Sequence, residues 1–284
     1  MTKNEIANID KMSVEEIMKA IGQDSGSDVG PSIPRLGINR EPENETGNRL
    51  PIGSYFLFDT NVGENIYGKP VTFRPFIGAI QYMHFDPDKG EYVNRSVITM
   101  NWKDEAIDLQ GGTRCGKVAR KEIVDLPPEE QSKQRQIKCY RLIYGTVTFK
   151  GKRGNGDSHD VKDFPVLWRV TGTGFRPASS AIDETKRRKK LMFTCEFNLD
   201  SFRQKKGSNV FYVPIVKVNS DANLPVTDKD KDTLRLFQEV IQQENDEIVS
   251  LWKAAKNKRS NPTDGDSAKI IEQVEAEPAE ILSN

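Results

Sequence analysis

Basic residues are interleaved with aromatic residues in three stretches of the chain. These stretches are TFRPFIGAIQYMHF (72–85), KCYRLIYGTVTFKGKR (138–153) and PVLWRVTGTGFRP (165–177). Proteins that bind single-stranded nucleic acid need both residue types, because cations hold the phosphate backbone while aromatic faces stack on unpaired bases. The pattern therefore predicts contact with a single strand. The alternative is that most of these aromatic side chains form the core of a β-rich domain.

Two further basic clusters flank a stretch that alternates like a β-strand. The first is the run Lys186–Lys190, and the second contains Arg203, Lys205 and Lys206. The run fits either the solvated end of a helix or a surface for a polyanion, whereas a nuclear-import signal is disfavoured because the run enters a predicted strand. The residues predicted to contact nucleic acid are Arg74, Lys138, Tyr140, Arg141, Tyr144, Lys150, Lys152, Arg153, Trp168, Arg169, Arg176, Lys186, Arg187, Arg188, Lys189, Lys190, Arg203, Lys205 and Lys206.

The residue types that usually form catalytic or metal-binding sites show no such pattern in this sequence. The two histidines, His84 and His159, have no cysteine or carboxylate arrangement beside them that spells a triad or a metal site. The stretch GGTRCGKV (111–118) matches G-x-x-x-x-G-K, but Val118 stands where a P-loop needs Ser or Thr for Mg²⁺. We interpret it as a glycine-rich cationic loop whose backbone amides are available to phosphates. We expect no enzyme activity, no metal and no cofactor.

Charge is distributed unevenly along the 284 residues, although 42 Lys and Arg balance 42 Asp and Glu. Residues 114–153 contain eleven basic and four acidic residues, while 1–65 contain eleven acidic and six basic ones. Residues 261–284 contain six acidic residues and one basic residue. A basic centre between acidic ends indicates a chain that binds a polyanion. The three separated cysteines, the lack of a long apolar run and the absence of a signal-peptide pattern predict a cytoplasmic protein without membrane contact.

The elements that must position these residues are mainly strands between residues 33 and 220. About eight strand-like segments are separated by turns rich in Gly, Pro, Asn and Asp. In Leu191–Leu199 the odd-numbered residues are apolar, which predicts a strand with one buried face. Its expected hairpin partner is Asn209–Val218, with residues 200–208 as the connecting loop and Pro214 marking an edge strand. The segments 151–160 and 127–136 are expected to be a cationic loop and an exposed insertion.

The two ends of the chain have a different character. Ser13 and Glu16 form a capping box before a short amphipathic helix, followed by a flexible linker, so residues 1–30 form an N-terminal arm. The predicted body spans 31–220. Within 221–260, a stripe of apolar residues predicts a long helix from about 228 to 256, which packs on the sheet or pairs with another copy of the chain. Residues 261–284 form a predicted acidic disordered tail. The apolar stripe of the long helix consists of Leu234, Phe237, Ile241, Ile248, Leu251, Trp252 and Ala255.

The layout resembles phage single-stranded DNA-binding proteins, in which an OB-fold body binds the strand and an acidic tail recruits replication proteins. The stretches IPRLGINR, GNRLPIGSYF, YVNRSV and DFPVLWRVTG are also similar to proteins of tailed phages. The resemblance implies a mainly β (α+β) fold, with an OB-like or related antiparallel barrel or sandwich, a long C-terminal helix and disordered termini. It implies binding of single-stranded DNA in phage replication or recombination, inside the bacterial host. The alternative is a β-rich virion structural or assembly protein whose terminal helices make subunit contacts.

Overall fold

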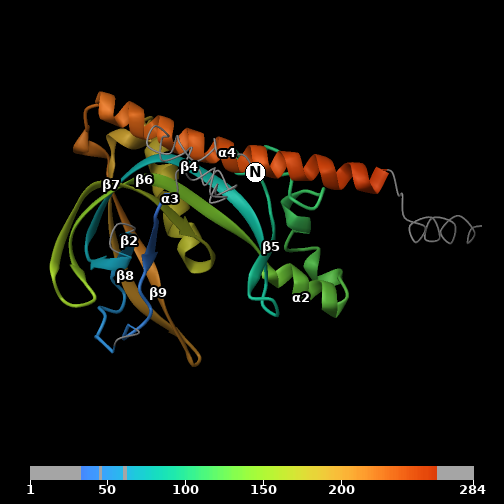
Figure 1. The fold of residues 1–284 in the computed structure, drawn as a ribbon, viewed down its shortest axis with the longest axis horizontal. Coiled ribbons are helices and arrows are strands. Elements are labelled where there is room, and N and C mark those ends of the chain that lie inside the picture. The colour runs from blue at the N-terminus through green and yellow to red at the C-terminus, as the bar shows by residue number, and fades with distance from the viewer. Residues whose placement is uncertain (1–32, 45–46, 60–62, 261–284) are drawn as a thin grey trace, which may run out of the picture. The chain divides into compact units, whose positions relative to one another are not determined.

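A computed structural model describes residues 33–44, 47–59 and 63–260 of the chain. The predicted N-terminal helix and the acidic tail lie outside these residues. The described part is mainly β, as predicted (Figure 1). Its strands are β1 (Arg35–Ile38), β2 (Tyr55–Asp59), β3 (Glu64–Gly68), β4 (Val71–Asp86), β5 (Glu91–Arg95), β6 (Ile137–Arg153), β7 (Ser158–Val170), β8 (Glu196–Lys206) and β9 (Asn209–Asn219). Its α-helices are α2 (Pro128–Gln136), α3 (Phe175–Arg187) and α4 (Asp228–Ser260).

The strands form one mixed sheet rather than the antiparallel sheet that was predicted. The order is β3-β2-β1-β7-β6-β4-β8-β9, with β5 paired to β4 and a further pairing between β3 and β6. The parallel pair is β1 with β7, where Leu36 lies opposite Trp168. Two long antiparallel partners, β4 and β6, run through the middle from Thr72–Thr148 to His84–Ile137. Because β3 pairs with both β2 and β6, the strands β1, β2, β3, β6 and β7 form a ring of paired neighbours.

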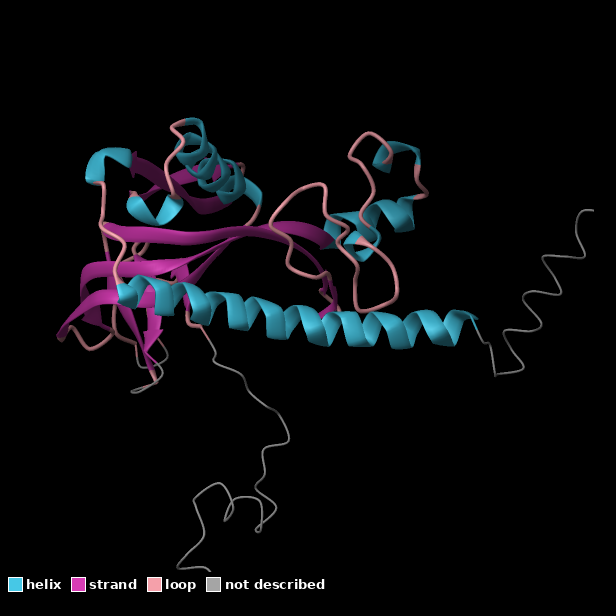
Figure 2. Cartoon of the chain, turned by 90° about the horizontal axis from the view of Figure 1, so that it is seen from above, coloured by secondary structure: helices cyan, strands magenta, loops and turns pink. Residues whose placement is uncertain are grey.

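The sheet has a hydrophobic core on each of its faces. The α3-side core contains Ile143, Val147 and Trp168 together with residues of α3 such as Ile182. The α4-side core contains residues such as Tyr144, together with residues of α4. The alternation of side chains along β6 produces this division, because successive residues of a strand point to opposite faces. Figure 2 shows the long strands between α3 on one side and α4 on the other.

Helix α4 packs on the sheet along much of its length, which confirms one of the two interpretations of the predicted helix (Figure 1). Phe237 is fully buried, and its ring lies 5.7 Å from the rings of both Phe76 and Tyr144. Further along, the Asn245 amide donates to the carbonyl of Ile98 and accepts from its backbone N–H, at 2.9 and 2.6 Å. The side chain of Asn245 thus satisfies both backbone groups of Ile98.

The N-terminus of α4 is fixed by a reciprocal set of hydrogen bonds. The backbone N–H and the hydroxyl of Thr227 donate to the Asp230 carboxylate at 2.7 and 2.8 Å, and the Asp230 N–H donates back to the Thr227 hydroxyl. This is the geometry of a capping box, in which two unpaired backbone donors of the first turn are satisfied together.

The β8–β9 hairpin differs from the predicted one at both ends. Leu191 is 61% exposed and precedes a 3₁₀ turn, in which the Thr194 N–H donates to its carbonyl, so the strand begins only at Glu196. The strand then continues through the predicted loop to Lys206, which lies opposite Asn209. The prediction for the 200–208 loop was therefore wrong. β9 ends the strand order, as Pro214 predicted.

Two other predicted loops also have regular structure. Residues 127–136 contain helix α2, which begins at Pro128, a residue type suited to the first turn because it has no N–H to leave unpaired. In the segment 151–160, β6 continues to Arg153 and β7 starts at Ser158, so the connection is confined to residues 154–157. Gly156, with φ of 94°, takes the left-handed backbone conformation that this tight turn requires.

Candidate nucleic-acid interface

The predicted aromatic contacts lie in the core. Trp168 and Tyr144 are each 1% exposed, and Tyr140 is 8% exposed. Trp168 packs against Phe73 with ring centres 5.8 Å apart, on the α3 side of the sheet. Tyr144 packs against Phe237 on the α4 side, and burial raises the pKa of its hydroxyl. These rings have no free face for a base, so we exclude Trp168 and Tyr144 from the interface.

Arg74 holds the start of α4 instead of facing solvent. Its guanidinium donates to both carboxylate oxygens of Asp230, at 2.8 and 3.1 Å, and to the carbonyls of Phe193 and Pro225. The side chain is 18% exposed and lies over the Phe76 ring. With its donors directed to these partners, Arg74 is a structural residue, and the prediction that it contacts nucleic acid is corrected.

Two other predicted cations form ion pairs within the protein. Arg153 donates to Asp59 at 2.8 Å and lies 3.8 Å from Glu64, with 13% of its side chain exposed. Arg188 pairs with Glu184 at 2.8 Å across one turn of helix. Arg153 is thereby fixed inside the ring of strands, whereas the Arg188 pair is exposed and contributes little to stability.

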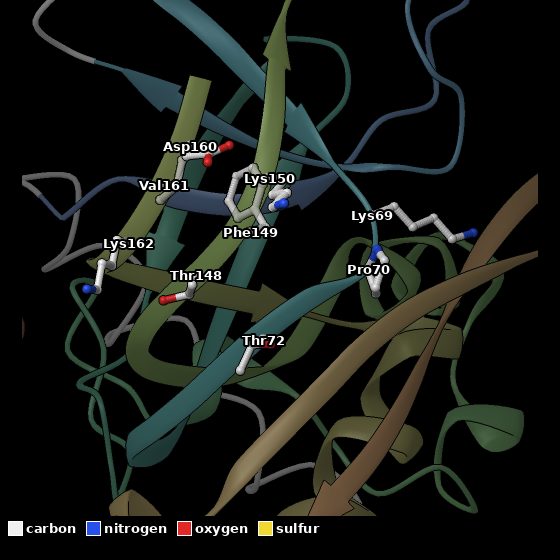
Figure 3. Close-up of a pocket in the computed structure, with 9 residues that line it drawn as sticks. All are labelled: Lys69, Pro70, Thr72, Thr148, Phe149, Lys150, Asp160, Val161 and Lys162. Carbon is white, nitrogen blue, oxygen red and sulfur yellow. The ribbon is translucent and has the colours of Figure 1, made fainter. Parts of the chain in front are cut away.

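The part of the sheet beyond the start of α4 is open. Even-numbered residues of β6 point to the α4 side, so Thr148 and Lys150 continue the row of Tyr140 and Tyr144 past the helix. They line a hollow of about 580 Å³ together with Lys162 of β7 (Figure 3). We call Thr148, Lys150 and Lys162 the open face. The hollow is further lined by Lys69, Pro70, Thr72, Phe149, Asp160 and Val161.

The open face carries positive charge from Lys150 and Lys162, whereas Lys69 at the edge of the hollow is paired with a carboxylate. Lys69 is committed elsewhere, since its ammonium lies 2.8 Å from Asp200 and donates to the Ser201 carbonyl at 2.7 Å. Figure 3 shows its side chain directed away from those of Lys150 and Lys162. Lys150 and Lys162 form no salt bridge within the described residues. Lys152 is a further exposed cation on β6, the strand of Lys150.

The run Lys186–Lys190 forms the end of α3, as one interpretation predicted. The helix ends at Arg187, and the amide of Lys190 bonds to the carbonyl of Thr185. Cations at this position are favoured by the negative end of the helix dipole. The Lys190 ammonium contacts the Asn223 side chain, while the other four cations are exposed. The position therefore has a structural explanation, and the exposed side chains remain available to a polyanion.

The second basic cluster lies at the opposite end of the β8–β9 hairpin. Lys206 is the last paired residue before the turn, and Arg203, Lys205 and Lys206 are all exposed. Lys190 is tied to Asn223, which follows the end of β9. The eleven residues of β8 separate the two clusters by about 35 Å at 3.3 Å per residue. The two clusters therefore lie near opposite ends of the β8–β9 hairpin.

One cluster combines arginines with an exposed aromatic ring. The Arg169 guanidinium lies 5.0 Å from the centre of the Tyr140 ring and 5.5 Å from that of Tyr92. The two tyrosine hydroxyls are 3.1 Å apart, and 41% of the surface of Tyr92 is exposed. Burial lowers the pKa of Arg35, and the charge of Arg169 lowers it further, so the two guanidiniums repel each other. Neither arginine forms a salt bridge within the part of the chain that the structure describes.

This cluster contains two predicted residues, Tyr140 and Arg169, and two that the sequence interpretation missed. Arg35 comes from β1 and Tyr92 from β5, which are separated from Arg169 by more than seventy residues. Their signal in the sequence was weak: Tyr92 is one aromatic residue in EYVNR, and Arg35 is a single cation after a proline. Lys138 and Arg176, the remaining predicted cations, are exposed at other positions. Arg141 is buried on the α3 side.

The glycine-rich loop at 111–118 is already occupied by a protein carboxylate. The backbone N–H groups of Gln110, Gly112 and Cys115 donate to Asp108 at 3.0 to 3.1 Å. These amides are not available to a phosphate, so that interpretation of the loop is corrected. Arg114 and Cys115 take left-handed backbone conformations, with φ of 53° and 55°, as the chain wraps around the carboxylate.

Groups that support chemistry are sparse in the described residues. His84 bonds to Gln136 and His159 to Arg153, and no cluster of three or more His, Cys, Asp or Glu side chains is arranged there to hold a metal. Burial raises the pKa of the Cys115 thiol to about 12. No α-helix of the described part combines the length and apolarity that crossing a membrane requires. The chain matches no protein-family model, and neither a curated protein nor a solved structure shows significant similarity to it.

Proposed function

We propose that the chain is a non-catalytic single-stranded DNA-binding protein that acts in phage DNA replication or recombination. The observation that carries the proposal is the cluster of Arg35, Arg169 and Tyr92, in which two guanidiniums that form no salt bridge within the described residues lie near a partly exposed ring. Single-strand binding requires this combination, because the cations bind phosphates and the ring stacks on an unpaired base. The proposal includes an OB-like character for the ring of strands β1, β2, β3, β6 and β7.

The open face and the basic clusters supply the electrostatic part of the proposed interface. Lys150 and Lys162 extend from the sheet beyond the start of α4, and the hairpin end carries three more cations. Each phosphate that a cation neutralises releases a counterion, so affinity falls as the salt concentration rises. In this proposal the acidic residues 261–284 compete with DNA for these cations and recruit replication proteins.

A binding titration of labelled oligo(dT) at several salt concentrations tests the proposal. We expect saturable binding that weakens with salt and prefers single to double strands. Tyr92→Leu and Arg35→Gln should each weaken binding by roughly tenfold, since base stacking and a phosphate contact are each worth about 1 to 3 kcal/mol. Arg35→Gln should also lower the salt slope, whereas Tyr92→Leu should leave it unchanged.

The matched control removes two exposed cations in the first turns of α4 that are not part of the proposed interface. Lys231 and Arg235 lie on the exposed side of α4, each paired with an aspartate one turn away. The double variant Lys231→Gln/Arg235→Gln should bind oligo(dT) like the wild type. Absence of wild-type binding at low salt would overturn the proposal, as would equal losses in the control and in the Tyr92 and Arg35 variants.

The run Lys186–Lys190 provides an independent measure of the electrostatic part. Replacing all five cations with glutamine should weaken binding and flatten the salt slope without unfolding the protein, because four of them are exposed. Circular dichroism and the unfolding midpoint check the fold. Unchanged affinity would assign the run to the solvated end of α3 alone.

The alternative function, a virion structural or assembly protein, is favoured by exposed apolar side chains at two extremities. Phe202 and Val210 near the hairpin end are 41% and 45% exposed, and Leu251 near the end of α4 is 46% exposed. Such residues fit subunit contacts. Light scattering after size-exclusion chromatography separates the alternatives: this function requires oligomers that Phe202→Ser/Val210→Ser dissolves, together with no binding of oligo(dT).

A further inference from the structure

Arg141 is a buried arginine that has no hydrogen-bond partner within the described residues. It lies in the centre of the sheet on β6, opposite Ile80 of β4 and Val170 of β7, and its side chain points to the α3 side. Only 4% of its surface is exposed. Its Nε is enclosed without a hydrogen-bond partner, and no hydrogen bond or salt bridge of its guanidinium occurs within the described residues.

The surroundings of Arg141 contain an aromatic cover and a polar stripe of α3. Its guanidinium lies 5.8 Å from the centre of the Trp102 ring, which in turn lies 5.9 Å from the ring of Phe175. Phe175, Ser179 and Asp183 follow each other at intervals of four residues, so they lie on one stripe of the helix. Phe175 contacts the Trp102 ring that covers Arg141, and Asp183 acts electrostatically on Arg141. Ser179 stands between these two residues on the stripe.

Two hydroxyls on the same side of the sheet as Arg141 also have no hydrogen-bond partner within the described residues. They are Oγ of Ser179, on the helical stripe, and Oγ1 of Thr99. Thr99 lies opposite Ile80, which in turn lies opposite Arg141, so all three side chains point to the same face of the sheet. Buried polar atoms are almost always hydrogen-bonded in folded proteins, so unpartnered donors on one side of the sheet suit a ligand that accepts hydrogen bonds.

The protein's own charges compensate Arg141 only in part. Burial lowers the pKa of Arg141, and the nearby Asp183 carboxylate and Cys139 act in the opposite direction. Asp183 is exposed and forms no salt bridge with Arg141. An arginine keeps its proton even under such conditions, so a positive charge is held inside the protein. A charge in that position is costly unless an anion and hydrogen bonds accompany it.

We propose that Arg141 and Ser179 bind a small oxyanion of the phosphate class beneath Trp102. A tetrahedral oxyanion accepts hydrogen bonds from both a guanidinium and a hydroxyl, which supplies what each side chain lacks. The 4% exposure of Arg141 limits the ligand to a small group, such as inorganic phosphate or a terminal phosphate. The site lies on the α3 side of the sheet, opposite the proposed DNA-binding cluster, so it does not depend on the proposed function.

Thermal unfolding in phosphate, compared with chloride at equal ionic strength, tests the site. We expect phosphate to raise the wild-type Tm by roughly 5 to 10 °C at a hundredfold excess over Kd, because a ligand that binds only the folded state stabilises it. Arg141→Met should abolish this rise, and Ser179→Ala should reduce it. Arg176→Met, which removes an exposed cation from the first turn of α3, is the control and should keep the full rise.

The result that would overturn the site is a Tm that does not respond to phosphate, which would mean that water and Asp183 suffice for Arg141. An equal rise in the wild type and in Arg141→Met would also overturn it. If Arg141→Met fails to fold, Ser179→Ala decides between these outcomes. Phosphate should also change the tryptophan fluorescence of the wild type but not of Trp102→Phe.

Two further ligands distinguish the sources of the oxyanion. If the site accepts a phosphate monoester, thymidine monophosphate should raise the Tm of the wild type but not of Arg141→Met. If the site accepts only inorganic phosphate, thymidine monophosphate should leave the Tm unchanged. Oligo(dT) carries internal phosphodiesters, which the buried site should exclude. Oligo(dT) binding that survives Arg141→Met, together with no phosphate effect, would refute this site and leave the proposed DNA-binding function intact.

Discussion

Arg74 and Arg141 lie on the two central strands of the same sheet, and each guanidinium lies close to an aromatic ring, yet their surroundings are opposite. Arg74, on the α4 side, donates to a carboxylate and two carbonyls. Arg141, on the α3 side, is more deeply buried and has no hydrogen-bond partner in the described residues. Arg74 therefore stabilises the fold. The position of Arg141, in contrast, is not explained by a contribution to stability.

The two regions also differ in how their charges are balanced. On the α4 side, Asp230 serves both the Arg74 guanidinium and the capping box of the helix, so one carboxylate satisfies several donors. On the α3 side, Asp183 balances Arg141 only from a distance. Natural proteins retain a destabilising group where function requires it, and removal of such a group is often neutral or stabilising. Substitution of Arg74 should therefore lower the stability of the fold, whereas substitution of Arg141 should leave it unchanged or raise it.

The largest expected effect is on the free energy of unfolding. Arg74→Met should lower it by about 3 kcal/mol, because the change leaves Asp230 and two carbonyls without their partner. Arg141→Met, without added phosphate, should stay within about 1 kcal/mol of the wild type or exceed it. Urea unfolding followed by circular dichroism measures both. A loss at Arg141 as large as that at Arg74 would remove the contrast between the two regions.

The second effect concerns acid stability on the α4 side. Burial alone would raise the pKa of Asp230, but the hydrogen bonds from Thr227 and the charge and hydrogen bonds of Arg74 outweigh it and hold this pKa below its usual value. A carboxylate with a lowered pKa stabilises the fold above its unfolded-state pKa of about 4, and this contribution is lost as the pH falls through the folded-state pKa. Unfolding midpoints between pH 6 and pH 3 should therefore fall.

The matched variant for this measurement is Asp230→Asn, which keeps the size of the side chain. Its stability should be lower at pH 6 and should fall less steeply with acid, since the titrating group is gone. The control on the other side of the sheet is Asp183→Asn, whose carboxylate forms no hydrogen bond within the described residues. A wild-type slope in Asp230→Asn would show that the acid sensitivity arises elsewhere.

The smallest effect reports on the charge of Arg141 itself. Burial raises the pKa of the Cys139 thiol to about 11, while a hydrogen bond with Tyr82 and the charge of Arg141 oppose the rise. Arg141→Met should raise this pKa further and slow alkylation of Cys139 by about twofold at fixed pH, because the thiolate is the reactive form. Mass spectrometry of the alkylated peptides measures the rate, with Cys115 as the internal control. A faster reaction at Cys139 would contradict a charged Arg141.

The strands and the long helix could be predicted from local patterns. The expected hairpin partner of the alternating stretch 191–199 located β9, and an apolar stripe located α4, because these signals depend on neighbours in the sequence. The interface could not be predicted in the same way. The partner of Arg74 is 156 residues away at Asp230, and alternation shows that β6 has two faces without showing which helix covers each. The apolar residues Leu191 and Phe193 fitted a strand pattern, yet Leu191 precedes a 3₁₀ turn, and Phe193 belongs to that turn and packs on the α4 side.

The contact between Asn245 and Ile98 has a consequence for self-association. A strand that lacks a neighbour offers its N–H and C=O groups to any extended chain, which is how aggregation by strand addition begins. At Ile98, which lies beside β4, both groups are taken by one amide side chain from α4. In β9, the last strand of the order, Pro214 has no N–H to offer. Asn245→Leu would leave both backbone groups of Ile98 without this partner, so α4 satisfies backbone groups beside the sheet as well as completing its core.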